Sequence, residues 1–164
     1  MRQNSYTGDD GWKLWEQPVV NPDWEQERYA NSIYYFWGAE AAQRQGTEAF
    51  TRFHLALLAS RYVEPIRKLY TRADIIGLAG EVGLDVPQFE RDFADLSCLD
   101  QLATDHQHAE SLNIFGTPTI VFTGDQAVYV KLDRVPDPAE SLDFWQVFSS
   151  TALERPYVLE MKRP

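Results

Sequence analysis

Cysteine is almost absent from this chain, because Cys98 is the only one among its 164 residues. A single cysteine excludes an intrachain disulfide and an intrachain dithiol that could cycle between two redox states. Histidine is scarce as well, and His54, His106 and His108 show none of the spacings typical of a zinc site. On a helix, the rings of His106 and His108 would point about 200° apart. The sequence therefore predicts no metal site.

Basic residues and long apolar runs are also few. The 15 lysines and arginines are outnumbered by 25 aspartates and glutamates, which gives a formal net charge of −10. Nucleic acids and anionic membranes both require clustered basic residues, so neither is an expected partner. No apolar run approaches the roughly 18 residues that span a bilayer. The N-terminal sequence MRQNSY has no apolar segment typical of a signal peptide, and we expect a cytoplasmic location.

The composition that remains is that of a globular protein. Apolar residues make up 44% of the chain and aromatic residues 13%, which is enough for a core of ordinary size. Residues 1–11 are polar and rich in glycine and aspartate, so we predict a flexible leader there. Residues 12–164 are then expected to form a single domain.

Helical spacing of apolar residues dominates the middle of the chain. Helices are predicted over residues 24–45 (continuous or broken in two), from 47 to the segment before Pro65, over 72–82, from about 87, over 98–112, and finally over 139–153. Strands are predicted over residues 12–20, 119–122 and 127–132, where β-branched and aromatic residues gather. Thr123-Gly124-Asp125-Gln126 is the predicted hairpin turn between the last two strands.

The most informative motif lies where the last central helix gives way to a strand. It has the sequence IFGTPTIVF over residues 114–122. The residue before a proline is driven out of the helical region, and X-Pro bonds are the ones that adopt the cis form at appreciable frequency. Gly116, Thr117 and Pro118 therefore predict a rigid turn, able to adopt a cis peptide, directly ahead of a strand.

This motif resembles the cis-proline loop of thioredoxin-fold proteins, and its surroundings resemble the DsbA-like branch, including its thiol-dependent nitroreductase-like members. The resemblance also rests on WKLW over residues 12–15 as the second thioredoxin strand, GLD over 83–85, and the ending VLEMKR over 158–163. It implies an α/β fold: a thioredoxin-like sheet interrupted by a helical insertion at about residues 24–112.

The same resemblance exposes a missing piece. In the family, an apolar strand leads into a Cys-x-x-C pair at the start of the first helix, where the helix dipole stabilises the thiolate. Residues 1–11 do not have the continuous apolar character of a buried parallel strand. We expect the first strand and helix, roughly 30 residues, to be absent. The chain is then a fragment, receives the strand from another chain, or has rebuilt its sheet without the chemistry.

Three functions remain open from the sequence. By resemblance, the full-length type is a thiol-disulfide oxidoreductase, or a reductase that uses a low-molecular-weight thiol; without the cysteine pair, this chain would be redox-inactive. A second hypothesis is a non-enzymatic binding module, a homodimer formed through an open sheet edge. A third is a fragment similar to kappa-class glutathione transferases or isomerases. No cofactor is expected beyond such a thiol, and small-molecule or thiol substrates are expected for the full-length family.

Two candidate sites follow from these hypotheses. Gly116, Thr117 and Pro118 would present a substrate-facing backbone edge, although a backbone supplies no nucleophile. Cys98 stands at a predicted helix start, a position that can lower the pKa of a thiol. Neighbouring Leu96, Leu99, Asp95 and Asp100 oppose thiolate formation, so we favour a structural role for Cys98 over a reactive one.

Overall fold

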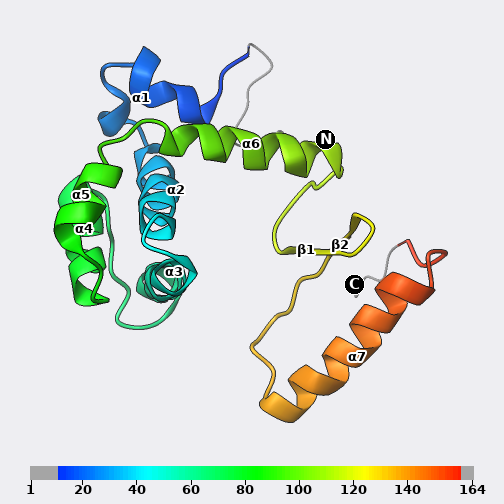
Figure 1. Ribbon diagram of the computed structural model, residues 1–164. Helices are drawn as coiled ribbons and strands as arrows, with labels where there is room; N and C mark the ends of the chain where they lie inside the picture. Colours follow the sequence, from blue (N-terminus) through cyan, green and yellow to red (C-terminus); the bar gives the residue numbers. More distant parts are fainter. Residues whose placement is uncertain (1–10, 160–164) are drawn as a thin grey trace. The chain divides into compact units, whose positions relative to one another are not determined.

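The computed structural model describes residues 11–159, so the predicted leader lies outside the described residues except for Gly11 (Figure 1). The contacts within the chain divide it into two compact units, residues 1–106 and 107–164. The family ending at residues 158–163 is described only for Val158 and Leu159. Each unit is considered by itself below.

The first unit is helical. After two 3-10 turns, η1 (Leu14–Glu16) and η2 (Trp24–Gln26), and the short α1 (Gln17–Val20) between them, come α2 (Ala30–Gln43), α3 (Thr47–Tyr62), α4 (Arg72–Glu81), α5 (Val86–Asp92) and the start of α6 (Cys98–Ser111). The central helix is α2, which contacts η2, α3, α4 and α5. The described elements match the predicted helices, and of the two alternatives for residues 24–45 the structure has the broken one, η2 followed by α2.

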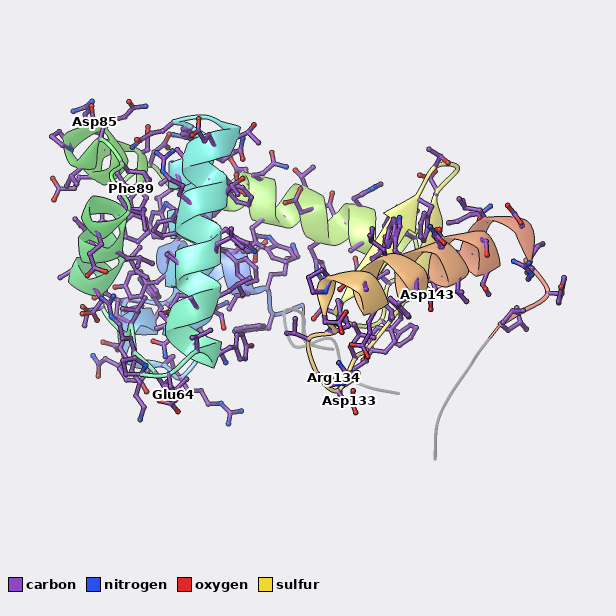
Figure 2. All side chains as sticks on the ribbon, turned by 90° about the horizontal axis from the view of Figure 1, so that it is seen from below. Glu64, Asp85, Phe89, Asp133, Arg134 and Asp143 are labelled. Carbon is purple, nitrogen blue, oxygen red and sulfur yellow. The ribbon has the colours of Figure 1, made fainter. Side chains whose placement is uncertain are left out.

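Local hydrogen bonds mark where these helices begin. At α4, the Thr71 side chain accepts from the backbone of Asp74, and the Asp74 carboxylate accepts from the backbone of Thr71, which forms a complete capping box. At α5, the Asp85 side chain accepts from the backbone of Gln88, and Pro87 occupies the first turn. Figure 2 labels Asp85 and Phe89 on α5. These residues explain why the sequence pattern placed both helix starts correctly.

The core of this unit is built from aromatic rings. Phe93 lies with its ring centroid 5.5 Å from those of Trp37 and Phe89, and 6.1 Å from that of Tyr34. The guanidinium of Arg72 lies 4.4 Å from the centre of the same ring and donates to the Phe93 carbonyl. Phe93 is therefore the point at which α2, α4 and α5 are joined.

The predicted strand over residues 12–20 was wrong. Only Lys13 forms an isolated bridge, and the chain then turns into η1 and α1. Pro18 occupies the first turn of α1, and the side chain of Gln17 donates to the Lys13 carbonyl. Leu14 and Trp15 are buried side by side while Val19 and Val20 are exposed, which is not the alternation that a strand needs. The supposed second thioredoxin strand is thus helical here.

Gly38, in the middle of α2, marks a close contact of this helix with side chains of α3 and α4. A Cβ at this position would lie 2.7 Å from Cγ2 of Ile75 and 3.2 Å from Cζ of Phe53, both fully buried side chains. Gly77 in α4 offers a matched control, because a Cβ there meets nothing within 4 Å. Alanine should gain up to about 1 kcal/mol in helix propensity at either site, whereas overpacking costs about 1–3 kcal/mol.

We therefore expect Gly38→Ala to lower the free energy of unfolding and Gly77→Ala to raise it. The two variants should differ by about 1–3 kcal/mol, measured by urea unfolding followed by circular dichroism. Equal stabilisation by both substitutions would contradict the close contact at Gly38.

The second unit contains a hairpin and a helix. Strands β1 (Thr119–Phe122) and β2 (Gln126–Tyr129) pair antiparallel, with Thr119 opposite Tyr129 and Phe122 opposite Gln126. Gly124 and Asp125 adopt positive φ in the connecting turn. The helix α7 (Pro138–Glu154) contributes Trp145 and Phe148, whose rings lie 5.8 and 5.7 Å from that of Phe122.

The second strand is shorter than predicted, because it ends at Tyr129 rather than Leu132. Proline explains the early end. Val130 still donates its backbone N–H to the Pro118 carbonyl at 3.1 Å. Pro118 itself has no N–H to donate in return, so the ladder stops there.

Candidate functional site

The end of α6 sets the direction in which the chain enters the candidate loop. Asn113 adopts a left-handed conformation with φ of 54°, and the backbone N–H of Ile114 donates to the Ala109 carbonyl. The N–H of Asn113 donates to Glu110, so the two bonds form a Schellman motif. This motif ends the helix sharply and sends the chain into Phe115–Pro118.

Tyr129 and Thr119 hold the loop in place. A Cβ on Gly116 would lie 3.4 Å from the Tyr129 ring, so the backbone of the loop passes directly over that ring. The ring of Phe115 lies 5.2 Å from the same tyrosine. The Thr119 hydroxyl donates to the Gly116 carbonyl at 2.6 Å. These contacts fix the loop on the hairpin from both of its ends.

The tip of the loop is open to solvent. Thr117 and Pro118 are exposed, and the peptide bond between them is cis. The Pro118 carbonyl is already used by Val130. Phe115 is 77% exposed and places an aromatic surface beside the tip. The arrangement can bind and orient an extended or flat group, but its backbone and hydroxyl groups include no activated nucleophile.

Cys98 lies in the helical unit, at the first residue of α6. It is only 2% exposed, and its Sγ donates to the Asp92 carbonyl at 3.5 Å. Burial raises the pKa of the thiol to about 11, although the nearby Arg44 acts in the opposite direction. At neutral pH the thiol is protonated, so the helix start does not activate it.

Charged residues brace the start of α6 around this cysteine. Arg44 donates to the Asp95 carboxylate and to the Ser97 hydroxyl, both at 2.7 Å. The hydrogen bond from Arg44, joined by those from Ser97, lowers the pKa of Asp95 to about 2. Nearby Glu40 behaves differently, because burial and the negative charge of Asp105 raise its pKa. The network positions α6 and supplies no base to Cys98.

Other chemistry-bearing groups are dispersed. Within residues 11–159, no three metal-ligating side chains gather into a group that could hold an ion. Tyr34 is the most perturbed phenol: burial and its hydrogen bond to Glu25 raise its pKa. The rings of Trp24 and Phe93 lie 5.1 and 6.1 Å from that of Tyr34, so this buried phenol belongs to the core. None of the helices described over these residues has the length and apolar character needed to cross a membrane.

A sequence model of the family described as thioredoxin matches residues 3–132, which is most of the chain. This chain belongs to the thioredoxin family. The matched range ends three residues after β2 and includes the Gly116–Pro118 loop. Seven helices and a small antiparallel sheet, counted over the described residues, are consistent with a thioredoxin-like α/β fold. No curated protein matched the chain.

The candidate residues of this thioredoxin-family chain fall in two places. Gly116, Thr117 and Pro118 share one loop of the second unit, whereas Cys98 is packed inside the first. Sequence reasoning did not identify Tyr129 as the support of the loop. The strand register would have suggested it, since Tyr129 stands opposite Thr119, directly after Pro118.

Proposed function

We propose that this chain is a DsbA-like member of the thioredoxin family that presents a substrate-facing loop but has no dithiol redox centre within its 164 residues. One observation carries the proposal: the only cysteine, Cys98, is buried, and its pKa is raised to about 11. A thiol-disulfide reaction needs an accessible thiolate, and a dithiol cycle needs a second thiol.

The loop supports the binding half of the proposal. Thr117 and Pro118 are exposed beside the aromatic ring of Phe115, and Tyr129 and Thr119 hold the loop in one conformation. A rigid, exposed backbone edge next to an apolar ring suits a thiol-bearing peptide or a small thiol compound. Redox chemistry on such a ligand would require a cysteine pair from another segment or another chain.

The test is a disulfide-reduction assay with dithiothreitol as reductant and insulin as substrate. We expect the chain to give the rate measured without protein, because it offers no thiolate for exchange. Cys98→Ser and Cys98→Ala should give the same rate, and circular dichroism should show that both variants are folded. A known dithiol thioredoxin serves as the positive control.

Turnover that is well above the background and lost in both variants would overturn the proposal and identify Cys98 as a nucleophile. A second function would follow from that result, since a single thiolate can still attack a low-molecular-weight disulfide, forming a mixed disulfide and releasing one low-molecular-weight thiol. Intact-mass analysis after incubation with oxidised glutathione would reveal that adduct.

A further inference from the structure

Lys131 comes directly after the residue that is hydrogen-bonded to the candidate loop. The backbone N–H of Val130 donates to the Pro118 carbonyl at 3.1 Å, which extends the β1–β2 register beyond the two strands. Continued by one more residue, this antiparallel register brings Lys131 level with Thr117. Both of these residues are exposed. The backbone therefore places a lysine beside the tip of the loop.

The exposure of neighbouring residues shows which face of the hairpin Lys131 shares. Val130 is half-buried, whereas Tyr129 and Lys131 on either side of it are exposed. In an extended chain, residues two apart lie on the same face. The ring of Tyr129 contacts the Phe115 ring and lies against Gly116 on that face. An exposed aromatic ring and a lysine thus flank the tip of the loop.

Lys131 differs from the other basic residues described in this unit. Arg134 donates to both oxygens of the Glu140 carboxylate at 2.7 Å, and Arg155 lies 4.0 Å from the Glu154 carboxylate. Lys131 forms no ion pair with any residue in the described part of the chain. A lysine ammonium is a compact charge with three donors on a flexible stem. Its donors are available to an anion that binds at the loop.

The sequence around Lys131 is acidic. Aspartate and glutamate outnumber lysine and arginine over residues 107–159. Asp133 is close in sequence, but its charge acts on Arg134, whose guanidinium pKa is raised by Glu140 and then by Asp133. Figure 2 labels Asp133 and Arg134 together ahead of α7. An anionic ligand is therefore repelled over much of this unit and attracted beside the loop.

We propose that Lys131 determines which ligands the loop selects, by binding the carboxylate of a low-molecular-weight thiol that rests on Phe115–Pro118. The inference rests on the proposed function, in which the loop binds a thiol compound, and it adds the charge that this compound carries. Because Lys131 is level with the tip, the carboxylate and the sulfur belong to one small molecule. Thiols without a carboxylate lack the group that Lys131 binds, and they bind less tightly.

The test is a titration of the isotope-labelled full chain, followed by the NMR shifts of its backbone amides. The probes are S-methylglutathione and its diamide, in which carboxamides replace both carboxylates; the methyl group prevents exchange with Cys98. We expect S-methylglutathione to bind about two- to fivefold more tightly than the diamide, which is the range of an exposed ion pair. The shifts should centre on Thr117 and Lys131, and the preference should decrease at high salt.

Two lysine variants show whether the preference comes from Lys131. Lys131→Gln should give the two probes equal affinity and leave the affinity for the diamide unchanged, which a merely structural effect would not do. Lys68→Gln is the matched control, because it makes the same change at an exposed lysine of the first unit. It should keep the preference. Phe115→Ala should weaken both probes alike, and circular dichroism should show that all three variants are folded.

Three results would overturn the inference. Equal binding of the two probes, or a preference that persists in Lys131→Gln, would overturn it and leave ligand binding by the loop intact. Shifts confined to residues outside the loop and hairpin would assign the carboxylate to another site. The absence of any shift at Thr117 with both probes would overturn the inference together with the binding half of the proposed function. The disulfide-reduction assay reports separately on the redox half.

Discussion

Replacing Phe93 by alanine is expected to lower the free energy of unfolding by about 3–5 kcal/mol. Phe93 is fully buried, and its ring contacts Tyr34, Trp37, Phe89 and the guanidinium of Arg72. The truncation removes apolar burial from three helices and leaves a cavity that they cannot all close. The cation–π contact of Arg72 is lost as well. Urea unfolding followed by circular dichroism measures the change.

The control for this experiment is Val19→Ala, which also truncates an apolar side chain in the first unit. Val19 is exposed, so its substitution should change the free energy of unfolding by no more than about 0.5 kcal/mol. Phe93→Leu should fall between the two, because it keeps part of the ring volume. A Phe93→Ala variant as stable as the control would mean that the aromatic core does not hold the helices together.

Alkylation of Cys98 in the folded chain is expected to be slower than in the urea-unfolded chain by a factor of about 100. The reactive species is the thiolate, and the pKa of about 11 lies well above the value of 9.0 for the unperturbed thiol. Burial slows the reaction further, because Sγ is covered. The measurement is the rate of iodoacetamide modification at pH 7.5, followed by intact mass.

Val19→Cys in a Cys98→Ala background provides an exposed thiol for comparison and should react at the rate of the unfolded chain.

The pH dependence of the free energy of unfolding has a defined sign. Since the folded thiol keeps its proton above the pH at which the unfolded thiol ionises, the folded state loses stability as the pH rises from 9.0 towards 11. Cys98→Ala should show a smaller loss over that range. Rapid modification of Cys98 in the folded chain would contradict this prediction and make Cys98 a candidate nucleophile.

Sequence patterns predicted those elements whose signals are local. Helices α4 and α5 were placed correctly because Thr71, Asp74, Asp85 and Pro87 act within a few residues of the helix starts. The β1–β2 hairpin was found because Gly124 and Asp125 favour its tight turn. In each case the residues that determine the structure lie within the segment they determine.

The errors and omissions involve contacts over longer distances. The apolar residues of 12–20 suggested a strand, but Leu14 and Trp15 are buried in a helical turn that packs on the rest of the core. No pattern linked Arg72 to Phe93, which are 21 residues apart. The position of Tyr129 under Gly116 depends on strand register, and the burial of Cys98 depends on how α6 meets its neighbours. These features required the three-dimensional arrangement.

The capping boxes have a consequence for the unfolded chain. Each is closed by residues three apart, Thr71 with Asp74 and Asp137 with Glu140, so neither depends on tertiary packing. Nucleation of the first turn is the costly step in helix formation, and these hydrogen bonds offset part of that cost before the core exists. The denatured ensemble therefore retains transient helical turns at the starts of α4 and α7, one in each compact unit. Removing a cap acts on that ensemble as well as on the folded state.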